Sequence, residues 1–131
     1  MQIRPFIWRA TVFLPPVTKK NSQRIIINSR TKRPMILPSA KYENYEKEAK
    51  KFIRPPDEPI STPVNVRCIY YMPTNRPCDL TNLMEATHDL LVKTKVIADD
   101  NSKVIYAVDG SRVYHDKLTP RTEIFIEEYS E

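Results

Sequence analysis

Glycine is almost absent from this chain, and this restricts the possible folds more than any other feature. Gly110 is the single glycine among 131 residues, whereas an average protein of this length would contain about nine. A phosphate-cradling loop needs several glycines close together, because they let the backbone turn tightly and approach the phosphate. P-loop and dinucleotide-binding Rossmann folds are therefore excluded.

Length and cysteine content set the broad class of the protein. The 131 residues predict one domain, 1–131, by the usual prior. No apolar run approaches the ~20 residues that cross a bilayer, and the first residues lack an apolar signal segment. The two cysteines, Cys68 and Cys78, are too few for a disulfide framework. These features predict a cytoplasmic protein.

Charge is distributed unevenly along the chain. Residues 1–54 contain 13 basic and 3 acidic side chains, and no acidic residue precedes Glu43. Such asymmetry predicts a polyanionic partner for the first half. A disordered basic arm or an ordinary solvated surface would give the same composition. The candidate phosphate-binding residues are Lys19, Lys20, Asn21, Arg24, Arg30, Lys32, Arg33 and Arg76.

Hydrophobic periodicity predicts a mixed architecture. Strands are expected at 6–14, 24–28, 35–37, 64–72, 96–100, 103–113 and 122–128. Helices are expected at 39–53, with Tyr42, Tyr45, Ala49 and Phe52 forming an apolar stripe, and at 79–94. Cys68 is expected to be a small core residue. The pattern indicates an α+β domain, in which one mixed, mostly antiparallel sheet packs against two main helices.

The helix expected at 79–94 has an acidic face opposite its apolar stripe. Asn82, Glu85 and Asp89 share this face, and Asp79 stands at the helix start. A carboxylate there could cap free N–H groups, face a cation, or do both. Any amphipathic helix has a polar face, so this pattern alone leaves both alternatives open.

Two adjacent carboxylates, Asp99 and Asp100, follow this helix. Neighbouring carboxylates repel each other, so holding both ionised is easier beside a cation. A strand returning from the helix could bring the pair beside Asp79. Oxygen ligands of this kind suit Mg²⁺ or Mn²⁺. An Asp-Asp-Asn turn without metal is the alternative, but a carboxylate cluster beside a basic half fits metal-dependent phosphodiester hydrolysis.

The central motif resembles the RusA family of Holliday junction resolvases. The matching segment runs from Cys78-Asp79-Leu80-Thr81-Asn82-Leu83 through Asp89-Leu90-Leu91 to Asp99-Asp100-Asn101-Ser102-Lys103-Val104. That family has an Asp-Leu-Asp-Asn helix start, a downstream helix aspartate and an Asp-Asp pair. A Pro-Pro then polar-Asn loop after the first strand and a final Thr-Glu-Ile strand extend the resemblance over nearly the whole chain.

The resemblance implies a small homodimeric endonuclease that cuts four-way DNA junctions with Mg²⁺ or Mn²⁺. It assigns the essential carboxylates to Asp79 and Asp100, with Asp99 beside them. Asp79, Asp99, Asp100 and Asp89 are then the candidate metal ligands, and Asp79, Asp100 and Glu85 the candidate catalytic residues. The implied reaction is in-line attack of a metal-activated water on the phosphodiester.

Two positions depart from the family pattern. Thr81 stands where the family has a second aspartate, and Glu85 where it has a catalytic lysine. Glu85 could restore the lost charge, because it lies one helical turn from Thr81. The same exchange could instead leave a junction-binding protein without catalysis. A structural or partner-binding domain whose basic half only solubilises it is the third alternative.

Overall fold

The computed structural model describes residues 6–18, 23–38 and 40–129, and within these ranges the side chains of 23–26 and 36–38 are not described. The strands are β1 (Phe6–Val12), β2 (Gln23–Ile27), β3 (Pro34–Pro38), β4 (Val64–Met72), β5 (Ile105–Ala107), β6 (Arg112–His115) and β7 (Arg121–Glu128). The helices are α1 (Ala40–Ala49), the short 3₁₀ helix η2 (Lys50–Phe52) and α2 (Leu80–Lys93).

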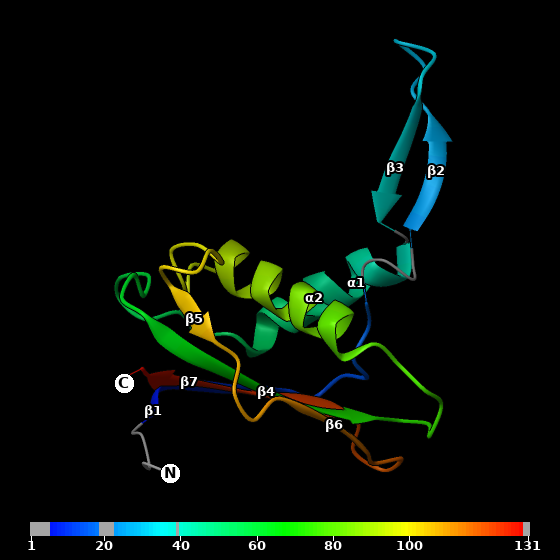
Figure 1. The fold of residues 1–131 in the computed structure, drawn as a ribbon. Coiled ribbons are helices and arrows are strands. Elements are labelled where there is room, and N and C mark those ends of the chain that lie inside the picture. The colour runs from blue at the N-terminus through cyan, green and yellow to red at the C-terminus, as the bar shows by residue number, and fades with distance from the viewer. Residues whose placement is uncertain (1–5, 19–22, 39, 130–131) are drawn as a thin grey trace.

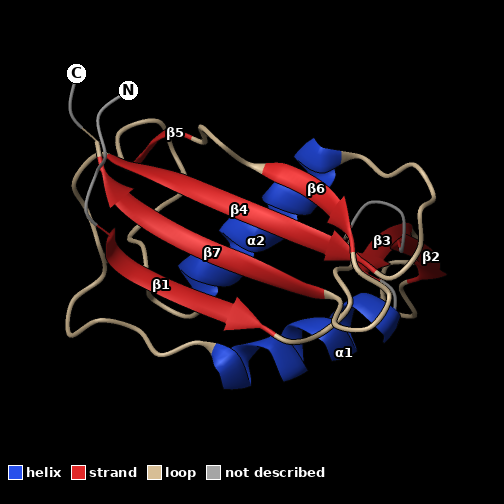
Figure 2. Ribbon diagram, turned by 90° about the horizontal axis from the view of Figure 1, so that it is seen from below, coloured by secondary structure: helices blue, strands red, loops and turns tan. Residues whose placement is uncertain are grey.

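The main sheet has five strands and confirms the predicted architecture. Its order is β1-β7-β4, with β5 and β6 both pairing with the outer edge of β4. β7 runs antiparallel to β1 and to β4, whereas β5 and β6 run parallel to β4. Figures 1 and 2 show α1 and α2 together on one face of this sheet. The domain is therefore α+β, as the sequence predicts.

The core lies between this sheet and the two helices. Its buried side chains alternate along β7, as in Thr122, Ile124 and Ile126, and β4 contributes Val64, Val66 and Cys68. Leu83, Ala86, Thr87, Leu90 and Leu91 form the buried stripe of α2. Burial raises the pKa of the Cys68 thiol to about 12, so the thiol stays protonated at neutral pH. Cys68 is thus a core residue, as expected.

A lysine follows the C-terminal cap of α2, at a position where glycine is usual. Lys95 has φ +64°, and the amides of Lys95 and Val96 donate to the carbonyls of Val92 and Leu91. This pattern closes many helices, and its left-handed residue is most often glycine. Lys32 has the same left-handed backbone, with φ +61°. A chain with so little glycine therefore places lysine at two such turns.

Gly110 occupies the position where a side chain fits least. Its φ is +84°, and an added Cβ would lie 2.6 Å from Cδ of Arg67. Arg67 is held in place, because it pairs with Glu127 at 3.2 Å and its guanidinium lies 4.2 Å from the centre of the Phe125 ring. Both the backbone angle and the close approach therefore require glycine.

Three predicted elements differ from the structure. The strand predicted at 96–100 is reduced to one parallel bridge between Ile97 and Ile60, because the chain turns at the aspartate pair. The strand predicted at 103–113 divides into β5 and β6 around the Asp109–Gly110 turn. The helix predicted at 39–53 becomes 3₁₀ after Ala49, which leaves Phe52 37% exposed against the Phe13 ring instead of in the core.

The β2–β3 hairpin forms a separate two-stranded sheet. Figure 1 shows it projecting from the helix-covered side of the domain, near the end at which α2 begins. We call it the arm. None of the helices in the described part of the chain is long and apolar enough to cross a membrane.

Candidate active site

Asp79 caps the N-terminus of α2. Its Oδ1 atom accepts hydrogen bonds from the amides of Thr81 at 3.0 Å and Asn82 at 3.4 Å. The backbone at Asp79 is extended (φ −95°, ψ 108°), as is usual for an N-cap residue. The capping role considered from sequence is therefore present. It fixes this exposed carboxylate at the positive end of the helix dipole.

Thr81 contacts Asp79 directly. Its hydroxyl donates to the same Oδ1 atom over 2.6 Å. Thr81, which stands where the resemblance places a second aspartate, therefore orients the first carboxylate. A carboxylate at position 81 would repel Asp79 unless a cation or a proton lay between them. The sequence did not reveal this bond, because it depends on the side-chain rotamers at the helix start.

The acidic face of α2 points away from the sheet. Glu85 is exposed and Asp89 is half-buried, while the opposite side of the helix is anchored in the core. A buried hydrogen bond of 2.7 Å between the hydroxyls of Tyr70 and Thr87 ties α2 to β4. The helix therefore holds its acidic face in a fixed orientation.

Asp99 and Asp100 lie on the loop that follows α2, and the Asp99 carboxylate accepts hydrogen bonds from within its own turn. Its Oδ1 accepts from the Asp100 amide at 2.7 Å, and its Oδ2 accepts from the Asn101 side chain at 3.1 Å. The Asp-Asp-Asn turn considered from sequence is thus present. Asp100 is exposed, and of this pair its carboxylate is the better placed to take an external ligand.

The loop that follows α2 sets the charge of Asp100 against His88 of that helix. The sequence predicted that a strand would bring the aspartate pair beside Asp79, and this stays a prediction. Burial lowers the pKa of His88, while the charges of Asp100 and Asp89 act in the opposite direction. Nε2 of His88 is buried and has no hydrogen-bond partner among the described residues. The sequence assigned His88 only a surface or core position.

The predicted metal ligands supply oxygen atoms only, which suits Mg²⁺. The described residues contain no group of three or more Asp, Glu, His or Cys side chains close enough to hold a metal ion. Mg²⁺ is commonly bound by one or two carboxylates together with waters and substrate phosphates. The donor chemistry therefore fits a cation shared with the substrate, and a closed cage of protein ligands is not formed.

The predicted DNA-binding residues lie in four parts of the chain. Arg30, Lys32 and Arg33 are exposed at the tip of the arm, and Arg76 is exposed on the loop before α2. Arg24 lies on β2, and its side chain is not described. Lys19, Lys20 and Asn21 lie outside the described residues. The structure thus places basic side chains on the arm and beside the start of α2.

Asn28 organises the tip of the arm, a role that sequence reasoning missed. Its Oδ1 accepts from the amides of Arg30 at 2.8 Å and Thr31 at 3.0 Å. Its carbonyl accepts from the Lys32 amide at 2.8 Å, and its own amide donates to the Arg33 carbonyl at 2.9 Å. The signal was available, because asparagine at the start of a polar turn commonly bonds the following amides.

Comparison with known proteins identifies the family. A search of curated proteins finds no match. Residues 14–127 match the family profile described as Endodeoxyribonuclease RusA. The match covers both helices, the arm and four of the five strands of the main sheet, with β1 outside it, and it includes the aspartates at 79, 89, 99 and 100. The chain therefore belongs to the RusA endodeoxyribonuclease family, and it is a Holliday junction endodeoxyribonuclease, a phosphodiester hydrolase of recombination and repair.

Proposed function

We propose that this chain resolves four-way DNA junctions with a divalent cation bound at the start of α2. The observation that carries the proposal is the exposed Asp79 carboxylate that caps α2. Figure 1 shows α2 on the same side of the main sheet as the basic arm. Asp79 and Asp100 would hold the cation, with Asp99, Asp89 and Glu85 in support.

The chain's own residues orient the reaction. When bound, Mg²⁺ or Mn²⁺ would offset charge on the scissile phosphate and activate the attacking water. Thr81 fixes the Asp79 carboxylate through its 2.6 Å hydrogen bond. Arg76, on the loop that leads into α2, would hold a neighbouring phosphate. The capped helix thus supplies a fixed ligand position and spares the enzyme the cost of ordering it during catalysis.

A four-way junction contains two symmetrically placed strands to be cut. We therefore propose that the enzyme acts as a homodimer, with one site for each strand. Its two thiols are unpaired, and Cys78 is exposed, which suits the reducing cytoplasm where we propose that it acts.

Incubation with synthetic DNA tests the proposal. We expect cleavage of a labelled four-way junction in Mg²⁺ or Mn²⁺, and none in EDTA or on a duplex of matched sequence. The products are separated on a denaturing gel. Binding to the junction without cleavage in either metal would favour the alternative of a catalytically impaired junction-binding protein.

The tip of the arm should determine how strongly salt weakens DNA binding. Arg30→Ala combined with Arg33→Ala removes two cations from a loop whose backbone is fixed by Asn28. Each lost phosphate contact lowers the slope of log affinity against log salt by ~0.9. We expect a decrease of about 1.8 in junction-binding titrations across salt concentrations.

Lys117→Ala is the matched control for this double variant. Lys117 is an exposed cation on the loop between β6 and β7, and Figure 1 shows this loop on the side of the sheet opposite the arm. Its removal should leave the salt slope unchanged. An unchanged slope in the arm double variant would place the phosphate contacts elsewhere.

A further inference from the structure

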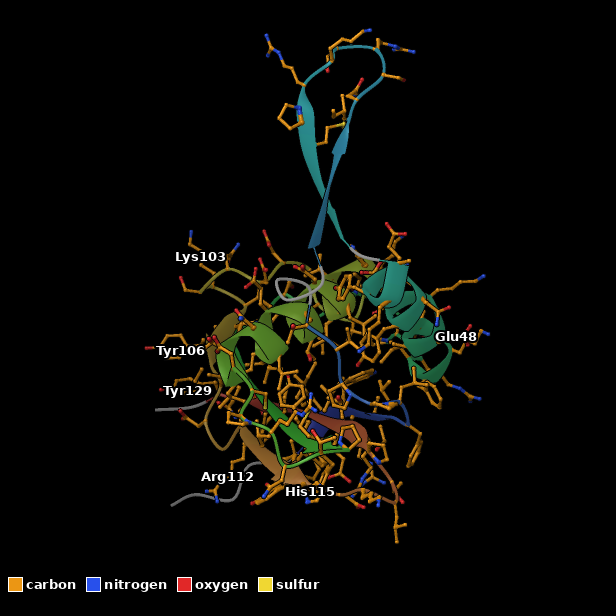
Figure 3. All side chains as sticks on the ribbon, turned by 90° about the vertical axis from the view of Figure 1, so that its right-hand side faces the viewer. Glu48, Lys103, Tyr106, Arg112, His115 and Tyr129 are labelled. Carbon is orange, nitrogen blue, oxygen red and sulfur yellow. The ribbon has the colours of Figure 1, made fainter. Side chains whose placement is uncertain are left out.

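The arm has a form that the cleavage site does not explain. In the described part of the chain its two strands pair only with each other, and Figures 1 and 3 show it extending beyond the two helices. A two-stranded hairpin is marginally stable alone in water. Retaining one on a projecting arm therefore indicates a function at its far end.

Apolar side chains lie directly behind the basic tip. Ile27 and Pro34 oppose each other in the strand register, so they lie on one face of the hairpin. Both are exposed, Ile27 to 71%. Met35 lies on the other face, where its sulfur accepts a 3.0 Å hydrogen bond from the Asn28 side chain. On one face, Met35 thus supports the tip through its hydrogen bond with Asn28. On the other face, Ile27 and Pro34 form an exposed apolar pair.

The backbone of the tip includes one energetically costly conformation. Lys32 adopts a left-handed conformation, which glycine would adopt without strain. Residues in such conformations concentrate at functional sites, where the surrounding structure maintains them. Lysine at this position keeps a cation on the loop. The tip therefore carries three cations, Arg30, Lys32 and Arg33, on a backbone that Asn28 holds by hydrogen bonds.

We propose that the far end of the arm is a wedge that enters the centre of branched DNA. Ile27 and Pro34 would pack against base pairs at the crossover, while the three cations hold phosphates of the flanking strands. Proteins that kink DNA use this combination of an apolar wedge and basic contacts. Bases at a crossover have fewer stacking partners than in a duplex, so separating them costs less.

Position and charge both favour DNA as the occupant of the arm. Figure 3 shows the loop that carries Lys103, three residues after Asp100, on the same side as the arm, whereas Arg112 and His115 lie on the other side. DNA crossing the helix layer could therefore meet the cleavage site and the arm together. Contact between the tips of two such arms would instead bring like charges together. The proposal rests on the proposed junction-cleaving function.

A fluorescent junction tests the wedge. The full chain is mixed, in EDTA, with a four-way junction that carries 2-aminopurine at the crossover, and with a matched duplex. Saturating wild-type protein should raise the fluorescence of the junction severalfold through unstacking and leave the duplex unchanged. Ile27→Ser should lose more than half of this rise, while its affinity by anisotropy stays within about threefold, because the phosphate contacts remain.

Leu118→Ser is the control, since Leu118 is 92% exposed on the loop between β6 and β7. It should retain the full fluorescence rise. A full rise with Ile27→Ser would overturn the wedge while leaving the cleavage function intact. Sedimentation of both variants tests whether the arm binds a second copy of the chain instead of DNA. Conversion of a dimer to a monomer by Ile27→Ser would show that it does. Failure of the wild type to bind the junction would overturn the proposed function as well.

Discussion

Asp79→Asn should abolish junction cleavage while the fold and the junction affinity persist. Asparagine is as good an N-cap as aspartate, so its side-chain oxygen can keep the bonds to the amides of Thr81 and Asn82. The substitution removes only the negative charge that would hold the cation. Loss of metal assistance, worth several kcal/mol, lowers the rate by at least about a hundredfold.

Single-turnover cleavage of a labelled junction measures this loss, and anisotropy measures binding. Asp79→Ala is the informative partner, because it removes the cap as well as the charge. It should lower the free energy of unfolding by about 1 kcal/mol, whereas Asp79→Asn should leave it nearly unchanged. Wild-type cleavage rates for Asp79→Asn across a Mg²⁺ titration would show that Asp79 is a helix cap and nothing more.

Local patterns account for the parts of the fold that the sequence predicted well. β4 runs over Val64–Met72, the range predicted from alternating apolar residues. α2 begins immediately after its predicted N-cap residue, Asp79. Both signals depend on neighbours along the chain. The strand expected at 96–100 was wrong because side-chain bonds of Asp99 and Asn101 favour a turn over the continued strand that an apolar run suggests.

The composition of the candidate site follows from the sequence and stays a prediction, whereas its contacts are visible only in the structure. The spacing of Asp79 and Asp100 and their family assignment could be read from the residues. Which oxygen of Asp79 the Thr81 hydroxyl binds could not, because that contact depends on rotamers. The direction in which the arm projects could not be predicted from the sequence either. A hairpin pattern fixes the pairing of β2 with β3, but its direction depends on the loops that join it to the domain.

Glu85→Lys alone should inactivate the enzyme, although it restores the lysine found in the family. Glu85 lies one turn along α2 from Thr81, so the two side chains are neighbours on the helix surface. If Glu85 replaces the carboxylate missing at position 81, its conversion to a cation removes that charge and adds repulsion toward Mg²⁺. We expect a loss of at least about a hundredfold in single-turnover cleavage.

The Thr81→Asp substitution should rescue this variant. Combined with Glu85→Lys it restores both family residues, and the lysine would offset repulsion between the new carboxylate and Asp79, which the Thr81 hydroxyl now contacts at 2.6 Å. Thr81→Asp alone should bind Mg²⁺ more tightly but unfold more easily without it, since two close carboxylates repel. Thermal unfolding with and without Mg²⁺ measures this difference.

The four proteins form a double-mutant cycle, and a shared site requires a non-additive result. The double variant should cleave at least about tenfold faster than Glu85→Lys, which corresponds to about 1.4 kcal/mol of transition-state stabilisation regained. Glu85→Gln is the matched control, because it removes the charge without adding a cation and should lose less activity than Glu85→Lys. If Glu85→Lys cleaves junctions as fast as the wild type, Glu85 is a solvated helix residue and the aspartates hold the cation without it.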